Sequence, residues 1–240
     1  MYYALMPSPT IVAIGGGSLN EDPRAQQIER YILGLTGKDD PRVCFIGTAS
    51  GEDTAIIVRF YSVFTSEICR PSHLNLINRK VHDIRSFLLS KDVIYVGGGN
   101  TAAMLAIWRQ HGVDGILREA WHNGIVLCGS SAGANCWHES STTDSFGPTL
   151  APLHDGLGFA PGAFCPHYDV EPQRRPLFNQ AVASGALSGG IACDNCCAVR
   201  YDGSSVAEFV SSTPTARAYL LEKTPTGSSE TEIIPRSLGA

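Results

Sequence analysis

A serine between two glycines is the first residue of this sequence whose surroundings suggest chemistry. The apolar run 124–128 leads into Gly129-Ser-Ser-Ala-Gly133, and residues 134–137 can begin a helix. A strand, a G-x-S-x-G turn and a helix form the context of a nucleophile elbow, whose tight turn presents the serine hydroxyl. The pattern predicts Ser131 as a nucleophile. It also aims the backbone N–H of Ala132 at the place where an oxyanion would form.

His167 is the histidine best placed to act as a general base. It follows Phe164-Cys-Pro166, and the proline restricts Cys165 to extended geometry, so the imidazole is expected at a strand end or in a loop. A lone histidine here would be structural. Next to a nucleophilic serine, however, an imidazole can accept the hydroxyl proton. We therefore expect His167 to act on Ser131.

The acid that would hold the imidazole is expected at Asp194, with Asp144 as the alternative. A carboxylate in the apolar strand predicted at 191–201 is costly unless it is paired. With Asp144 the chain order is Ser, Asp, His, as in α/β-hydrolases, although both partners then follow the serine unusually closely. Asp169 and Glu171 are too near His167 in sequence to orient it, and are expected to meet a substrate amine.

A second glycine-rich turn, at 97–99, also follows an apolar run and precedes a helical pattern. Consecutive glycines let the backbone approach a ligand and point N–H groups toward it. Gly98 or Gly99 is expected to supply a second oxyanion donor, and Asn100 and Thr101 to contact substrate. A phosphate cradle is the alternative, although the P-loop lysine and the G-x-G-x-x-G spacing are missing. A tight turn with positive φ is the plainest interpretation.

Alternating strands and helices would position these residues. Apolar strands are predicted at 10–15, 42–47, 72–77, 92–96 and 124–128, and helices at 23–35, 54–64, 83–89, 101–110 and 113–122. Strands without polar alternation argue for a parallel sheet covered on both faces. Further strands at 191–201, 206–210 and 216–221 are expected as antiparallel additions at one edge. We predict a three-layer α/β/α fold with a mostly parallel sheet.

The site is expected at one rim of that sheet. In open α/β sheets, ligands bind beyond the carboxyl ends of the strands, where the turns at 15–17, 97–99 and 129–133 all fall. Residues 1–240 are expected to form a single α/β domain, because no linker or repeat interrupts them. Residues 225–240 are polar and rich in Gly, Ser and Pro, and are expected to be a loose tail.

Composition narrows the class of protein. The 240 residues are 43% hydrophobic and carry a net charge of −5, without a basic stripe, so nucleic acid is not an expected partner. No apolar run reaches the ~20 residues of a membrane span, and the N-terminus lacks signal-peptide features, so a cytoplasmic protein is expected. The eight cysteines are expected to be reduced. Since Cys193 and Cys196 lack a second ligand pair, no metal or cofactor is expected. A homodimer is left open.

Three motifs together resemble one family. Gly97-Gly-Gly-Asn-Thr101, Gly129-Ser-Ser-Ala-Gly-Ala-Asn135 and Pro166-His-Tyr168 are similar to motifs of the peptidase E and cyanophycinase family of serine peptidases. The resemblance implies a fold like that of class I glutamine amidotransferases, with serine in place of the nucleophilic cysteine. It also implies Ser131 as nucleophile, His167 as base, and an oxyanion hole made by Ala132 and the 97–99 turn.

The resemblance leaves the acid of the triad open. Several relatives carry a glutamate where this sequence has Cys193, others an aspartate at the position of Asp194, and some assignments use an acid that corresponds to Asp144. Peptidase E cleaves dipeptides that begin with aspartate, and an arginine after the histidine is implicated. Arg174 or Arg175 is expected in that role. The loop 168–175 is shorter here, so strict Asp-X specificity does not follow.

We therefore expect a serine exopeptidase that acts on dipeptides or short peptides. Cyanophycinase activity is less expected, because no motif distinctive of that polymer substrate is present. One alternative is an amidotransferase-like hydrolase of small amides or esters that uses the same serine. The other is a non-catalytic binding module in which Gly129–Gly133 is a glycine-rich turn with an idle serine.

Overall fold

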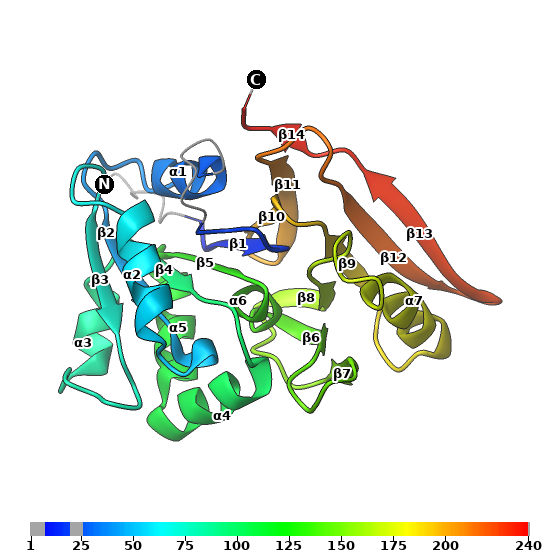
Figure 1. Ribbon diagram of the computed structural model, residues 1–240, viewed down its shortest axis with the longest axis horizontal. Helices are drawn as coiled ribbons and strands as arrows, with labels where there is room; N and C mark the ends of the chain where they lie inside the picture. The colour runs from blue at the N-terminus through cyan, green and yellow to red at the C-terminus, as the bar shows by residue number, and fades with distance from the viewer. Residues whose placement is uncertain (1–7, 20–25, 240) are drawn as a thin grey trace, which may run out of the picture.

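The computed structural model describes residues 8–19 and 26–239, in which two sheets are seen (Figure 1). The larger sheet, within these residues, has the order β14 (Arg236–Ser237), β11 (Ser205–Ser211), β10 (Cys197–Asp202), β1 (Thr10–Ile14), β5 (Val126–Ser130), β4 (Val93–Val96), β2 (Arg42–Ile46) and β3 (Arg70–Leu74). Strands β1, β5, β4, β2 and β3 run parallel, and β10 joins β1 antiparallel.

Helices cover both faces of this sheet, because its strands bury side chains on both sides. On β1, Val12 and Ile14 pack in one core cluster with Phe60, while Ile11 and Ala13 belong to another with Trp108. The first cluster includes residues of α1 (Gln27–Gly34) and α2 (Thr54–Val63), and the second includes residues of α3 (Ile84–Leu89), α4 (Thr101–His111) and α5 (Val113–His122). The predicted three-layer α/β/α arrangement is confirmed.

The described residues also form a second, smaller sheet. Within the described residues its order is β13 (Gly227–Ile233), β12 (Ala218–Thr224), β9 (Gly190–Cys193), β8 (Ala160–Cys165), β6 (His138–Thr143) and β7 (Ala151–Leu153). Helix α7 (Arg174–Ser184) contributes Phe178 and Val182 to a core cluster with Leu221 of β12. Figure 1 shows the β12–β13 hairpin extending beyond α7.

The C-terminal part departs from the sequence expectations. The strand predicted at 191–201 is two strands, β9 and β10, in different sheets, and the chain bends between them at 194–196. The segment predicted at 216–221 belongs to the second sheet. Residues 227–233 form β13, paired with β12 from Ala218↔Ile233 to Thr224↔Gly227, so the tail is not loose. Pairing supplies the backbone hydrogen bonds that a polar composition does not reveal.

Two short elements complete the chain, η2 (Thr48–Ser50) and α6 (Ala132–Asn135). Residues 23–25 of the helix predicted at 23–35 lie outside the described residues. None of the helices in the described ranges combines the length and apolar character needed to cross a bilayer.

Candidate active site

Ser131 sits on a sharp turn between β5 and α6. Its φ of 56° and ψ of −112° are unfavourable for a residue with a side chain. The flanking glycines are required by close packing: a Cβ on Gly133 would lie 2.2 Å from the Val96 carbonyl oxygen, and one on Gly129 would lie 2.5 Å from the Gly133 oxygen. This is the geometry that the G-x-S-x-G pattern predicts, and it holds the serine beyond the end of β5.

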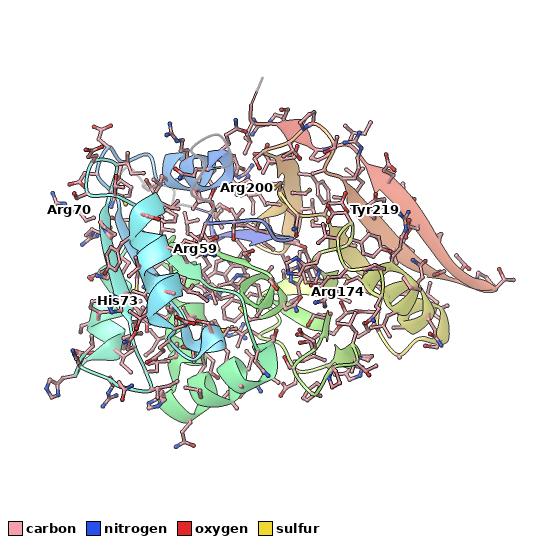
Figure 2. The ribbon with its side chains drawn as sticks, viewed as in Figure 1. Arg59, Arg70, His73, Arg174, Arg200 and Tyr219 are labelled. Atoms are coloured by element: carbon pink, nitrogen blue, oxygen red, sulfur yellow. The ribbon has the colours of Figure 1, made fainter. Side chains whose placement is uncertain are left out.

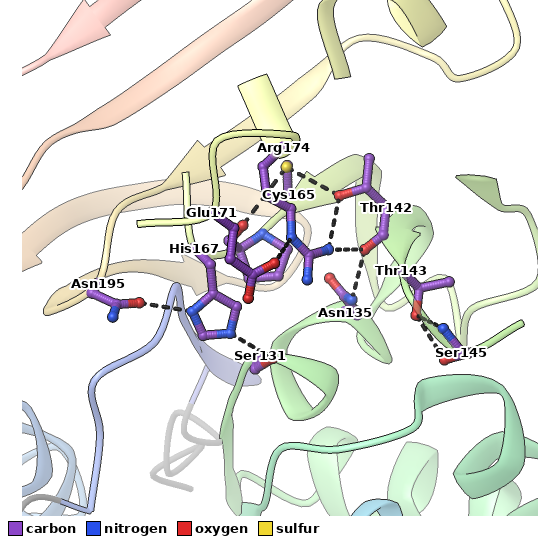
Figure 3. A network of polar contacts seen from close by, with 11 residues as sticks. Ser131, Asn135, Thr142, Thr143, Ser145, Cys165, His167, Glu171, Arg174 and Asn195 are labelled. Atoms are coloured by element: carbon purple, nitrogen blue, oxygen red, sulfur yellow. Dashed lines mark hydrogen bonds and ion pairs between the residues drawn. The ribbon is translucent and has the colours of Figure 1, made fainter. Parts of the chain in front are cut away.

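His167 lies next to Ser131, in the loop between β8 and α7 (Figure 3). Its Nε2 is 2.8 Å from Ser131 Oγ, and its Nδ1 is 2.8 Å from Oδ1 of Asn195. Because an amide oxygen only accepts hydrogen bonds, Nδ1 carries the proton and donates it to Asn195. Nε2 is then unprotonated and accepts the hydrogen bond of the serine hydroxyl. A base in this tautomer can take the proton of Ser131.

Neither predicted acid contacts His167. Asp194 turns toward the second sheet, where its Oδ2 accepts the Arg217 backbone N–H at 2.8 Å. Its Oδ1 is buried with no hydrogen-bond partner among the described residues, and burial raises the pKa of this carboxyl to about 6. Asp144 is exposed and makes no hydrogen bond to His167 in the described part of the chain.

The sequence pattern does not single out Asn195, for a physical reason. It predicts one strand over 191–201, in which Asp194 would be the misplaced polar residue. In the structure, residues 194–196 form the turn between the two sheets, so Asp194 and its neighbour Asn195 point to different partners. The Asp-Asn pair was the available signal, because both residue types favour turns. The Asn195 side-chain amide orients the His167 ring through a hydrogen bond but, unlike a carboxylate, carries no negative charge.

Three successive carbonyls at the end of β1 hold the site together. Ile14 O accepts the Ser131 N–H at 3.1 Å, Gly15 O accepts the His167 N–H at 3.0 Å, and Gly16 O accepts the Cys196 N–H at 2.8 Å. Each of the three donor residues has positive φ, at 56°, 54° and 64°. Such conformations cost on the order of 1–3 kcal/mol each and persist only where neighbours over-determine them. The end of β1 provides that constraint.

Gly16 is also packed against the hydrogen bond between His167 and Asn195. A Cβ at this position would lie 2.0 Å from Asn195 Oδ1 and 2.4 Å from His167 Nδ1. No side chain can occupy this space while the two groups stay bonded. The turn at 15–17 therefore positions His167 through its backbone.

A cleft of about 290 Å³ opens beside the serine. The residues that line it come from four loops or turns and the start of α7: Gly99, Asn100, Ser131, Asp144, His167, Glu171 and Arg174. Arg174 is 3% exposed, and its Nε donates to Glu171 Oε2 at 2.7 Å while Nη1 donates to the Thr142 carbonyl at 2.9 Å. These contacts, drawn in Figure 3, hold the guanidinium against the cleft wall. Its Nη2 has no partner among the described residues.

The predicted substrate-binding residues divide into two groups. Asn100, Glu171 and Arg174 line the cleft, whereas the other three do not. Thr101 is fully buried at the start of α4. Asp169 accepts the Asn195 backbone N–H at 2.8 Å and so shapes the turn that carries it. Arg175 pairs with Glu230 and stacks 4.8 Å over the Tyr219 ring, away from the cleft. The carboxylate-binding role predicted for Arg174 or Arg175 is therefore open only to Arg174.

The predicted oxyanion donors lie at the serine. A Cβ on Gly98 would be 3.4 Å from Ser131 Cβ, so the 97–99 turn passes directly beside Ser131. Ala132 follows the serine as the first residue of α6. In the described part of the chain, the N–H groups of Gly98 and Ala132 make no hydrogen bond. A Cβ on Gly99 would instead meet the Ala49 oxygen at 2.2 Å, so this glycine is required by packing against η2.

Residues 8–19 and 26–239 hold no group of three or more His, Cys, Asp or Glu side chains suited to a metal ion. The cysteines are all free thiols, and burial raises the pKa of Cys193, Cys165 and Cys136, among others. A buried thiol with a raised pKa is a poor nucleophile and a poor metal ligand.

Comparison with known proteins places the chain among peptidases. The model of peptidase family S51 matches residues 11–209. The uncharacterized peptidase YgaJ of Bacillus subtilis (strain 168) is 46% identical over 209 residues, which are 87% of this chain and 90% of that protein. Peptidase E of Haemophilus influenzae (strain ATCC 51907) is 31% identical over 142 residues, 57% of this chain and 54% of its own length.

Solved structures show the same fold. A peptidase from an acI-B1 actinobacterium superposes with a TM-score of 0.67 at 17% identity, over 98% of both chains. A putative peptidase E from Listeria monocytogenes EGD-e gives a TM-score of 0.60 at 20% identity, over 82% of this chain and 96% of that one. With the family match over most of its length and an elbow serine paired with a histidine, this chain is a member of peptidase family S51, a family of serine peptidases.

Proposed function

We propose that this protein is a serine exopeptidase that hydrolyses dipeptides or short peptides from their amino-terminal end. The observation that carries the proposal is the 2.8 Å contact between Ser131 Oγ and His167 Nε2, with the opposite ring nitrogen bonded to Asn195. A serine and a base held at this distance meet the geometric requirement for nucleophilic catalysis.

In the proposed reaction, Ser131 Oγ attacks the scissile carbonyl as His167 Nε2 takes its proton. The N–H groups of Ala132 and Gly98 are the donors for the oxyanion, and a donor of this kind contributes roughly 3–4 kcal/mol in comparable sites. The imidazolium then protonates the leaving amine, and the C–N bond breaks to leave an acyl-serine. Water, deprotonated by His167, attacks the acyl carbon. The acyl C–O bond then breaks, the imidazolium returns the proton to Ser131 Oγ, and the amino-terminal product leaves.

The charges in the cleft support recognition of an amino-terminal residue. Asp144 and Glu171 can pair with a free α-ammonium group, while the unpaired Nη2 of Arg174 can meet a carboxylate. An aspartate at the amino terminus presents both charges. Since Glu171 already bonds Nε of Arg174 at 2.7 Å, the guanidinium is partly neutralised. We therefore expect a preference for Asp-X rather than an absolute requirement.

The test is hydrolysis of a dipeptide panel, Asp-X against Glu-X, Ala-X, Leu-X and Arg-X. Ser131→Ala should lower kcat by at least about 10³-fold while keeping the fold, because it removes the covalent route. Arg174→Met should reduce the Asp-X preference, and Arg175→Met, whose guanidinium lies outside the cleft, is the matched control. Wild-type turnover by Ser131→Ala would rule out this mechanism.

Labelling with a fluorophosphonate separates the remaining alternatives. Labelling of Ser131 with cleavage of small amides or esters, but of no peptide, would indicate an amidase-like or esterase-like hydrolase. No labelling and no hydrolysis would indicate a binding module in which the elbow is only architecture.

A further inference from the structure

A second pocket, of about 180 Å³, lies beside the nucleophile and is separate in its lining from the cleft described above. Gly97, Gly98 and Ser130 form the side near the serine, since Ser130 precedes the nucleophile and Gly98 packs against it. The other lining residues are Gly17, Ser18, Leu19, Ile56, Arg59 and Tyr95. The 97–99 turn thus borders both hollows, and of the two neighbouring serines Ser130 lines this pocket while Ser131 lines the cleft.

This pocket has a simpler charge pattern than the first. Arg59 is the charged residue among its described lining, and its guanidinium forms no ion pair within the described ranges. Ile56 and Arg59 are three residues apart on α2, so both face the same side of that helix. Figure 2 shows Arg59 on α2, on the opposite side of the strand ends from Arg174.

Tyr95 also lines the pocket, and its side chain is otherwise fully buried. Together with the apolar side chains of Leu19 and Ile56, the pocket offers one cation and an apolar wall.

We propose that this pocket binds the carboxyl-terminal residue of a dipeptide, with Arg59 on its α-carboxylate and Leu19 and Ile56 against an apolar side chain. This inference rests on the proposed peptidase function and specifies its substrate class. The first cleft holds both signs of charge and suits an amino-terminal residue, while the second pocket holds a cation and suits a carboxyl terminus. A dipeptide that occupies both places its single peptide bond at Ser131.

Recognition of the free carboxylate would also set substrate length. A longer peptide has an amide where the dipeptide has its charge, so it would lose the contact with Arg59. The preferred substrates are therefore dipeptides with a free carboxyl terminus and an apolar second residue such as leucine or valine.

The test compares Asp-Leu with its carboxyl-terminal amide, Asp-Leu-NH₂, on wild type, Arg59→Met and Arg59→Lys. We expect wild type to favour the free dipeptide about 10- to 100-fold in kcat/KM. Arg59→Met should bring that ratio close to one, and Arg59→Lys should restore part of it. Arg70→Met is the matched control, because Arg70 is an exposed arginine on β3 that pairs with Asp40. It should leave the ratio unchanged.

A binding measurement separates this inference from the peptidase proposal. Calorimetric titration of Ser131→Ala with the same two ligands reports affinity without turnover. Tighter binding of Asp-Leu that is lost in the Ser131→Ala, Arg59→Met double variant supports the pocket even if wild type hydrolyses no peptide. Equal binding of acid and amide, or a preference that survives Arg59→Met, overturns the inference even if wild type is an active peptidase.

Discussion

Asn195, rather than Asp194, is predicted to orient the catalytic base, and paired variants can test this. Asn195→Ala removes the acceptor that lies 2.8 Å from His167 Nδ1. In the transition state the imidazole becomes positively charged, and a hydrogen bond to a charged group is worth about 1.5–3 kcal/mol. At about 1.36 kcal/mol per tenfold change, kcat should fall about 10- to 150-fold.

Asp194→Asn is the matched control for that variant. The asparagine can keep an acceptor for the Arg217 N–H, and the residue does not contact His167, so kcat should stay within about threefold of wild type. The assay is steady-state hydrolysis of the best dipeptide, with the rate of fluorophosphonate labelling as a readout that needs no substrate. A large loss in Asp194→Asn, together with normal activity in Asn195→Ala, would refute the assignment and restore Asp194 as the acid.

Three further predictions concern positions around this site and the fold. Gly16→Ala should lower kcat at least about tenfold with KM little changed, because a Cβ would force Asn195 and His167 apart; an active variant with an unaltered pH–rate profile would contradict this. Burial raises the pKa of Asp194 to about 6, so the folded state binds its proton more tightly than the unfolded state does, and stability falls as pH rises from about 4 to 6. We compare the free energy of unfolding of wild type with that of Asp194→Asn in urea. The difference between the two proteins should fall by about 1–3 kcal/mol from pH 4 to pH 7. An unchanged difference would exclude this linkage. Lys38 and Arg42 lower the pKa of Asp92, so Asp92→Asn should cost about 1 kcal/mol at pH 7, and thermal melts should show this gap shrink as pH falls below about 4.

The parallel sheet and the nucleophile turn follow from sequence alone. Uninterrupted apolar strands can only be buried on both faces, which requires helices on both sides. Gly129 and Gly133 must lack side chains because backbone atoms approach within 2.2–2.5 Å of where a Cβ would lie. Both features depend on residue type over a few neighbouring positions. The family motifs likewise predict Ser131 and His167 as site residues by local pattern.

The hydrogen-bond partner of His167 and the choice of arginine in the cleft depend on tertiary structure. Asp194 and Asn195 are neighbours in sequence, and the bend between two sheets decides which one reaches His167. Arg174 and Arg175 are also neighbours, but residues adjacent on a helix point about 100° apart, so packing against the second sheet leaves only Arg174 in the cleft.

The backbone hydrogen bonds from the end of β1 to the site are the clearest feature that the sequence does not predict. Ile14, Gly15 and Gly16 bind the backbones of Ser131, His167 and Cys196, which are more than 100 residues away in the chain. A backbone carbonyl accepts a hydrogen bond whatever its side chain, so the residue types do not encode these contacts. Only the folded chain brings the three strained loops to one strand end.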